Sequence, residues 1–161
     1  MYARYIGIDP GVKGAIASID STNTYTEPLK HSKYEPLTTL ESMANKFTII
    51  CVEKVQPRPS NSLRSIVTSC KNWGRLQAHL ELLDCAVIYI TPQEWQKDLR
   101  LRRYWKRPKN ITDDKWQSMK YNMRKQLHKK EAIKLFPELR VTLINADALL
   151  IAHYIRLKND R

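Results

Sequence analysis

An apolar run near the start of the chain, ending in a carboxylate and a tight turn, constrains the fold of this sequence more than any other feature. Residues 5–9 read YIGID, and Pro10 and Gly11 follow. This short run, rich in Ile and Tyr, predicts a buried strand, and a Pro-Gly pair favours a sharp turn directly after it. Asp9 therefore stands at the carboxyl end of a strand, where it serves either the local hydrogen bonds of the turn or a functional site.

A second apolar run ends in the same way. Residues 47–53 read FTIICVE, so Glu53 also follows a β-rich run and precedes a proline-containing loop. If the two strands are parallel neighbours, Asp9 and Glu53 emerge at the same edge of one sheet. Two carboxylates that close repel each other by roughly a few kcal/mol at an effective dielectric of about 20, unless a cation lies between them. The pair therefore predicts a metal site at a sheet edge.

The length and the remaining pattern predict a single domain, residues 1–161, in which strands and helices are mixed. Residues 14–20 follow the first strand closely enough to form an antiparallel hairpin with it. A helix that starts near Thr112 either continues to Phe136 or breaks before Lys130. The other expected elements are strands at 25–26 and 86–90 and helices at 37–44, 63–83, 92–99 and 145–155.

The clearest helix connects two strands. Apolar residues recur at helical spacing from Leu63 to Leu83 and predict one strongly apolar face. A strand, crossover helix and strand of this kind make the two strands parallel. Thr91 and Glu94 then have the spacing of a capping box, with Pro92 at the first helical position. A further short helix is therefore expected directly after the second of these strands.

Positive charge is concentrated in one part of the chain. The formal net charge is +12, and residues 97–130 hold thirteen Lys or Arg residues against three acids. Such a patch is typical of nucleic-acid binding, although an acidic membrane surface or protein attracts the same charge. Tyr104 and Trp105 lie inside this segment, where they either stack on exposed bases or pack a lid against the body. The residues expected to contact nucleic acid are Arg58, Arg64, Arg100, Arg102, Arg103, Tyr104, Trp105, Lys106, Arg107, Lys109, Lys129 and Lys130.

Other features limit the class of protein. No apolar run approaches the roughly eighteen residues that span a membrane, and the first residues form a strand and not a secretion signal. We therefore expect a cytoplasmic protein without membrane association. We expect Cys51, Cys70 and Cys85 to be small core residues, and not parts of a zinc site or a disulfide framework. Structural or surface roles are expected for His79, His128 and His153, which show no ligand spacing.

Asp147 is the third candidate acid. It lies near the start of residues 145–155, a strongly apolar stretch that predicts a buried closing helix. The helix dipole favours an acid in a first turn, so the position by itself leaves a structural role open. A buried acid, however, needs a partner. A layout of this kind can bring Asp147 to the edge that carries Asp9 and Glu53.

Four segments follow one another along the chain: residues 6–11 (IGIDPG), Val52-Glu53, Thr91-Pro92-x-x-Trp95 and residues 146–152 (ADALLIA). In this order they resemble the RuvC-type Holliday junction resolvases, especially the short phage-encoded branch. The resemblance covers nearly the whole chain. It implies a ribonuclease H-like α/β fold, with a mixed five-stranded sheet flanked by helices. It also implies a homodimer, with Trp73, Leu76 and Leu80 in the core or on the dimer face, and the host cytoplasm if the protein is phage-encoded.

The resemblance further implies an activity. It is that of a crossover junction endodeoxyribonuclease, which cleaves branched DNA such as four-way junctions and forks and depends on Mg²⁺ or Mn²⁺. Carried over residue by residue, it makes Asp9, Glu53 and Asp147 the catalytic metal ligands, with two ions expected. Two such ions about 3.5–4 Å apart can activate a water and stabilise the leaving oxygen, and hard ions take oxygen ligands. Lys129 and Lys130 are expected either beside the scissile phosphate or on a solvated face.

The sequence departs from the family at one position. The family usually carries an acid or a histidine three residues before the helix aspartate, and this chain has Ile144 there. Because an apolar side chain cannot bind a metal, the second metal position is expected to be weak. Asn145 could offer a neutral oxygen, or Asp147 could bridge two ions, in its place. The alternative is a non-catalytic or weakly catalytic protein that binds branched DNA, and a third hypothesis is a related nuclease acting on RNA·DNA hybrids. An actin-like ATPase is excluded because four glycines cannot supply its glycine-rich phosphate loops.

Overall fold

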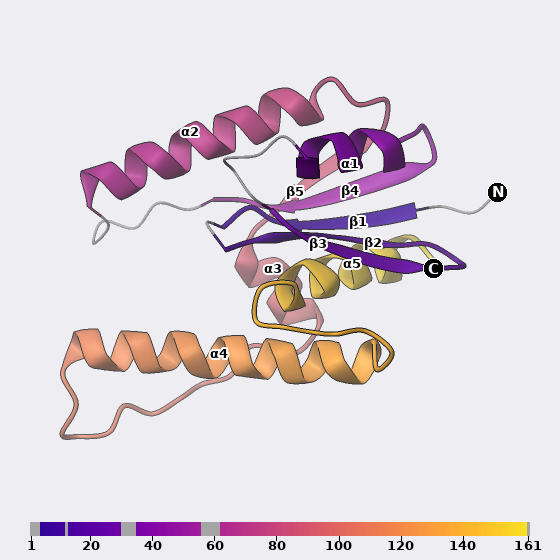
Figure 1. The fold of residues 1–161 in the computed structure, drawn as a ribbon. Coiled ribbons are helices and arrows are strands. Elements are labelled where there is room, and N and C mark those ends of the chain that lie inside the picture. The colour runs from indigo at the N-terminus through magenta and orange to yellow at the C-terminus, as the bar shows by residue number, and fades with distance from the viewer. Residues whose placement is uncertain (1–3, 12, 30–34, 56–61, 161) are drawn as a thin grey trace.

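The computed structural model describes residues 4–11, 13–29, 35–55 and 62–160. The centre of the molecule is a five-stranded sheet with the order β3-β2-β1-β4-β5 (Figure 1). The strands are β1 (Arg4–Asp9), β2 (Ala15–Ile19), β3 (Thr24–Pro28), β4 (Thr48–Glu53) and β5 (Ala86–Ile90). The helices are α1 (Glu35–Met43), α2 (Leu63–Leu80), α3 (Pro92–Asp98), α4 (Asp113–Leu135) and α5 (Ala146–Asn159). A mixed sheet flanked by helices is the fold class that the sequence predicts.

The directions of the strands decide where the two strand-end acids lie. β1 pairs antiparallel with β2 and parallel with β4, and β4 pairs parallel with β5. Ile8 lies opposite Val52 in the register of β1 and β4, so Asp9 and Glu53 are the next residues on neighbouring parallel strands. Both acids therefore lie at the carboxyl edge of the sheet.

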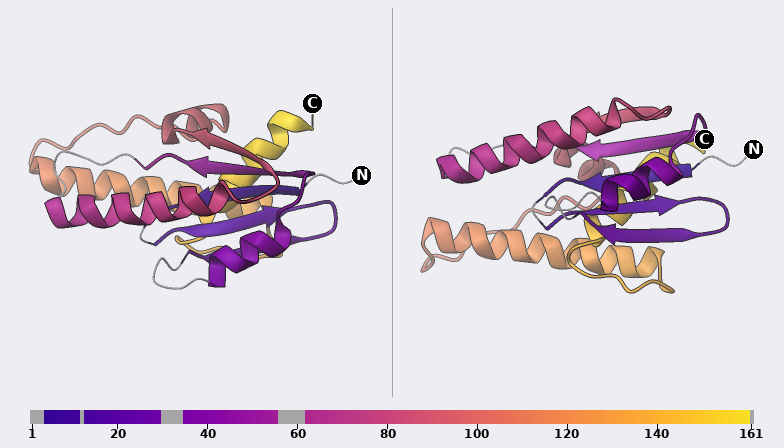
Figure 2. Two further views of the ribbon diagram at one scale, coloured as in Figure 1. Left: turned by 90° about the horizontal axis from the view of Figure 1, so that it is seen from above. Right: turned by 45° about the horizontal axis from the view of Figure 1, so that its top comes forward.

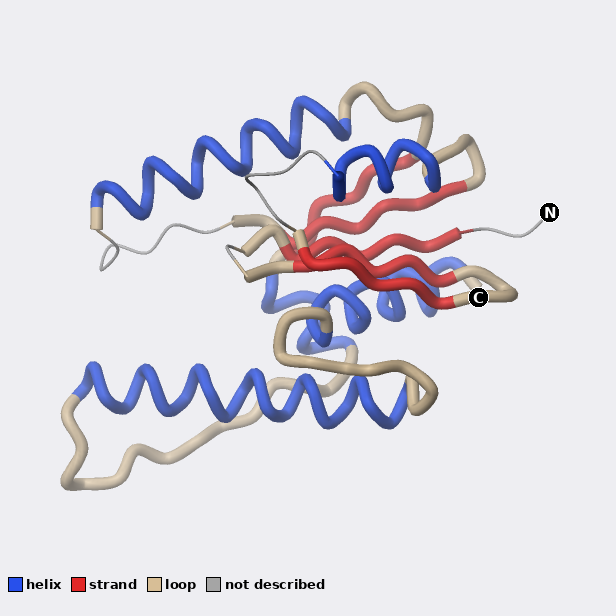
Figure 3. Tube along the Cα trace, viewed as in Figure 1, coloured by secondary structure: helices blue, strands red, loops and turns tan. Residues whose placement is uncertain are grey.

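Alternate strand residues pack into two separate cores. Ile6 and Ile8 pack with residues of α1 and α2, whereas Tyr5 and Cys51 pack with residues of α3, α4 and α5. Figure 3 shows these two groups of helices on opposite faces of the sheet. Because side chains alternate along a strand, Asp9 shares the face of Tyr5. It therefore points toward the side that α4 and α5 cover.

Gly7 allows α5 to lie directly against β1. A Cβ atom at this position would collide with the backbone carbonyl of Ala148 and the backbone amide of Ala152. α5 packs against β1 and β2, and residues 146–152 are all buried. This close approach places Asp147, in the first turn of α5, near the end of β1.

The helix starts follow the local sequence. Ser62 is the N-cap of α2, and Thr91 and Glu94 form the expected capping box at the start of α3. α4 is continuous over 23 residues, so no break occurs before Lys130. No helix among the described residues combines the length and the apolar character that crossing a membrane requires.

The N-terminal half of α2 extends away from the sheet. Leu76 and Leu80 are buried, but Leu63 and Val67 are 77% and 58% exposed. Figure 2 shows that α2 and α4 extend past the strands in the same direction. The apolar face expected along the whole of α2 therefore reaches the core only near its C-terminal end. The prediction that Cys70 is a core residue is wrong for the same reason, because its side chain is exposed.

Candidate active site

Two of the three candidate acids meet around a lysine. Asp9 and Asp147 are only 8% and 7% exposed. The Lys125 Nζ atom, from α4, lies 2.8 Å from Asp147 Oδ2 and 3.4 Å from Asp9 Oδ2. One ammonium group therefore bridges an acid of β1 and an acid of α5, and it supplies the positive charge that two close carboxylates require.

Lys125 was not among the residues singled out from the sequence. Burial alone would lower the pKa of its ammonium group, but the charges of Asp147 and Asp9 outweigh this effect and raise the pKa. Lys125 is thus firmly protonated beside the aspartates. Lys129 and Lys130, the lysines expected near the scissile phosphate, form no ion pair with the three acids. Lys129 is partly buried one turn after Lys125, and Lys130 is exposed.

His128 is the second residue that the sequence did not indicate. Its side chain is fully buried, and Nδ1 lies 2.9 Å from Asp147 Oδ1. The other ring nitrogen, Nε2, has no hydrogen-bond partner among the described residues. Because an ionised carboxylate can only accept hydrogen bonds, Nδ1–H of His128 is the donor to Asp147. His128 is therefore a buried partner of Asp147, and a surface role is excluded.

Glu53, at the end of β4, is held by Trp95. The indole Nε1–H of Trp95 donates to Glu53 Oε2 at 2.7 Å. Burial, followed by the charge of Asp9, raises the pKa of Glu53 to about 7, although the Trp95 hydrogen bond acts in the opposite direction. The Trp95 ring also contacts His128, with the ring centroids 5.1 Å apart. Trp95 and His128 thus connect the Glu53 carboxylate to the Asp147 carboxylate through two hydrogen bonds and one ring contact.

The two aspartates differ in their electrostatic environment. Burial raises the pKa of Asp9, although Lys125 and a hydrogen bond from the Gly11 amide, 3.0 Å from Oδ1, act in the opposite direction. Burial also acts to raise the pKa of Asp147, but the hydrogen bond to His128 and the charge of Lys125 outweigh it and lower the pKa. Asp147 is therefore the firmly ionised member of the cluster.

The donor set of this cluster suits a hard divalent cation. Asp9, Glu53 and Asp147 offer carboxylate oxygens, the ligands that Mg²⁺ and Mn²⁺ take. As they stand, no three Asp, Glu, His or Cys side chains in the described part of the chain form a group that could hold a metal ion. The Lys125 ammonium lies between the two aspartates instead. The residue types fit the cation, and the Lys125 side chain must move for them to share one.

Asn145 cannot replace the missing fourth ligand in this conformation. Its Oδ1 accepts from the Thr142 amide at 2.7 Å, and its Nδ2 donates to Thr26 Oγ1 at 3.1 Å and to the Arg140 carbonyl at 3.2 Å. These hydrogen bonds engage the side-chain amide of Asn145 and hold the segment that precedes α5 in place. Ile144 is 38% exposed and supplies no polar atom in its side chain.

Most of the expected nucleic-acid contacts that the structure describes are exposed. Arg58 falls outside the described residues, and Arg64 is exposed on α2. Residues 100–109 join α3 to α4 and are largely exposed. Arg107 forms an ion pair with Asp113 at the start of α4, so part of this charge is used within the protein.

Comparison with known proteins identifies the fold. No protein-family model matches the sequence, and no curated protein matches it. Among solved structures, RuvC from Thermus thermophilus is similar, with a TM-score of 0.55 and 14% sequence identity over 98% of this chain and 97% of the RuvC chain. At this identity the likeness concerns the fold and does not bear on the phage-encoded branch. The strand order, the flanking helices and this likeness show that the chain has the ribonuclease H-like fold of RuvC.

Proposed function

We propose that this chain is one RuvC-like nuclease domain that cleaves branched DNA by divalent-metal-dependent phosphodiester hydrolysis. The observation that carries the proposal is the convergence of Asp9, Glu53 and Asp147, from β1, β4 and α5, at the carboxyl edge of the sheet. All three acids are partly or fully buried. The charge of Asp147 raises the pKa of Asp9, and the charges of Asp9 and Asp147 raise the pKa of Glu53. Structural ion pairs seldom need three acids from three separate elements, whereas a hydrolytic metal centre does.

The chain's own residues have distinct roles in this proposal. Asp9, Glu53 and Asp147 would hold Mg²⁺ or Mn²⁺, which when bound supplies an activated water and stabilises the leaving oxygen. Trp95 and His128 orient Glu53 and Asp147 through the hydrogen bonds described above. Such outer hydrogen bonds fix the direction of ligand oxygens.

Lys125 has a role on the substrate side. Its side chain is 15% exposed, so it borders solvent as well as the aspartates. Displaced from the aspartates, its ammonium group can donate to a phosphate oxygen of the DNA strand. The same displacement frees the oxygens of Asp9 and Asp147, so one movement serves both the substrate and the metal.

The surface beside the cluster supports DNA as the substrate. Residues 97–130 carry most of the surplus positive charge, and their contribution to binding should fall steeply with salt. A homodimer remains part of the proposal because Leu63 and Val67, exposed apolar residues of α2, offer a surface for a second copy. Four-way junctions and forks are the substrates that the resemblance to RuvC-type resolvases implies.

A second candidate function is binding of branched DNA without cleavage. It is favoured by the engaged amide of Asn145, by Ile144, and by the position of Lys125 between Asp9 and Asp147. A protein of this kind would bind through the same basic surface. In such a protein the ion pairs of Lys125 with Asp9 and Asp147 would be a permanent structural feature.

The deciding experiment compares four substrates: a four-way junction, a fork, a linear duplex and an RNA·DNA hybrid. Wild-type protein should cut the junction or the fork in Mg²⁺ or Mn²⁺, and Asp9→Asn should bind the same DNA without cutting it. Binding by wild type without cleavage in either metal would establish the second candidate. Preferred cutting of the hybrid would reassign the substrate. Metal titration of cleavage tests the expected weak second ion.

A further inference from the structure

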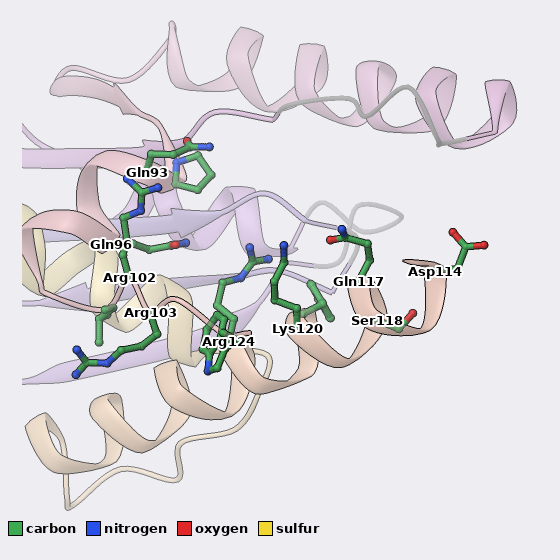
Figure 4. A pocket seen from close by; sticks show the side chains of 13 residues that line it. Gln93, Gln96, Arg102, Arg103, Asp114, Gln117, Ser118, Lys120 and Arg124 are labelled. Atoms are coloured by element: carbon green, nitrogen blue, oxygen red, sulfur yellow. The ribbon is translucent and has the colours of Figure 1, made fainter. Parts of the chain in front are cut away.

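A polar pocket with a volume of about 770 Å³ lies between α3, the segment that follows it, and the N-terminal half of α4 (Figure 4). Pockets that enclose small ligands span roughly 300–1,000 Å³, so this one has room for a nucleotide. None of Asp9, Glu53 or Asp147 lines it. The pocket is therefore a separate feature from the acid cluster.

The charge of the pocket selects an anionic ligand. Arg102, Arg103, Lys120 and Arg124 line it, against the single acid Asp114. Within the described chain, none of these four basic residues forms an ion pair with an acid. In Figure 4 the polar ends of Lys120 and Arg124 rise from the same side of α4. Arginine and lysine in this density are suited to phosphate groups.

The uncharged groups of the pocket narrow the class of ligand. Trp105 lines it, is partly buried, and has no aromatic or cation contact at its ring among the described residues. The amides of Gln93, Gln96 and Gln117 line the same space. Aromatic rings stack on unpaired bases, and amides can hydrogen-bond base edges. Phosphate-binding cations, an indole ring and amides together match a nucleotide better than an acidic peptide.

The position of the pocket links it to the acid cluster. Gln117, Tyr121 and Arg124 line the pocket at the helical spacing that continues to His128, one turn further along α4. On α3, Gln93 and Gln96 line the pocket. Between them in the sequence is Trp95, which donates a hydrogen bond to Glu53. The same two helices therefore build the pocket and support the cluster.

We propose that this pocket binds one unpaired nucleotide of the DNA strand whose backbone passes the acid cluster, with its base stacked on Trp105. The inference rests on the proposed function and adds to it the reason for choosing branched DNA. A paired duplex keeps its bases stacked inside the helix and cannot place one there. A fork or a flap has a single strand whose unpaired bases are available.

The test measures binding without metal, so that it does not depend on cleavage. Full-length protein in EDTA is titrated into two labelled DNAs, a linear duplex and the same duplex with a flap of unpaired thymidines. Trp105→Ala should weaken flap binding by about 5- to 150-fold, the range expected for loss of one base-stacking contact. It should leave duplex binding nearly unchanged. Trp105→Phe should restore much of the loss, because it keeps an aromatic ring.

Phe47→Ala is the control. Phe47 is an exposed aromatic residue directly before β4, at the opposite edge of the sheet from the acids, and it does not line the pocket. This variant should leave the ratio of flap to duplex affinity as in wild type. A circular dichroism melt of Trp105→Ala establishes that the variant is folded before its affinity is interpreted.

Three outcomes overturn the inference. They are an unchanged flap-to-duplex ratio in Trp105→Ala, an equal effect of Phe47→Ala, and competition by free thymidine monophosphate at concentrations as low as those at which the flap DNA binds. The last would make the pocket a site for free nucleotides. Failure of the proposed function has a different signature, namely normal flap binding without cleavage in Mg²⁺ or Mn²⁺.

Discussion

Trp95 Nε1 lies 2.7 Å from Glu53 Oε2 and joins a residue of α3 to the acid at the end of β4. Trp95 is also fully buried and contacts the ring of His128, whose Nδ1 reaches Asp147. One aromatic pair therefore supports two of the three acids from inside the protein. The acids meet because the strands are parallel and α5 lies close to β1, and the pair holds two of them in fixed directions.

Removal of the Trp95 hydrogen bond should loosen Glu53 while keeping an aromatic ring in the core. Trp95→Phe is expected to weaken Mn²⁺ binding by about 10- to 100-fold, the usual effect of losing an outer hydrogen bond to a metal ligand. Isothermal titration calorimetry measures this change without DNA. Trp73→Phe is the matched control, because Trp73 contacts Tyr89 on the other face of the sheet. Equal losses in the two variants would contradict the role of Trp95.

Lys125 is expected to matter most when metal is absent. Lys125→Met leaves Asp9 and Asp147 without their cation, and breaking a buried pair in this way destabilises a protein by about 3–5 kcal/mol. The lower end is expected here, because the Lys125 side chain retains 15% exposure. Urea unfolding in EDTA measures the loss, with Lys129→Met as the control. Mn²⁺ should restore part of the stability of Lys125→Met, and an absence of any such rescue would argue against metal binding between the aspartates.

The pKa of Glu53 predicts a pH-dependent stability. The group titrates near 4.5 as an unperturbed side chain and near 7 in the folded protein, chiefly because it is buried. Between these values the folded state binds more protons than the unfolded state. The free energy of unfolding should therefore fall as the pH rises from about 4.5 to 7 and then level off, by at most about 3 kcal/mol.

Urea unfolding in EDTA across this pH range measures the slope. Glu53→Gln should reduce the slope of stability against pH. The slope that remains reflects Asp9, because burial also raises the pKa of that group. Glu138→Gln, which removes an exposed acid after α4, should keep the wild-type slope. An identical profile in wild type and Glu53→Gln would show that Glu53 is not the titrating group.

Gly7 and Gly74 should respond in opposite ways to the same substitution. Gly7→Ala places a methyl group against the backbone of α5, so α5 must shift away from β1. We expect a loss of at least about 3 kcal/mol, as for severe overpacking. Gly74→Ala, within α2, meets no atom within 4 Å and should stabilise the protein by about 0.5–1 kcal/mol. Thermal melts of the two variants test this contrast directly.

Several elements could be predicted from local sequence because local chemistry decides them. The runs ending in Asp9 and Glu53 form parallel neighbouring strands, and Thr91 with Glu94 caps α3 as expected. Alternating or continuous apolar residues and capping side chains act over a few residues, so their consequences are visible in the sequence. The convergence of Asp9 and Glu53 was expected only if their strands were parallel neighbours, and the register of β1 and β4 confirms this pairing.

The residues that complete the cluster depend on packing between distant elements. Lys125 and His128 lie on α4, whose mainly polar sequence does not reveal which side faces the sheet. The same holds for α2, where an apolar stripe that looks continuous is buried only at Leu76 and Leu80. By itself, the sequence predicted the strands, the positions of Asp9 and Glu53 at strand ends and the position of Asp147 near the start of a buried helix. Only the tertiary structure decided which lysine and which histidine contact them, because that choice depends on the orientation of α4 against α5 and not on the residues next to it in the chain.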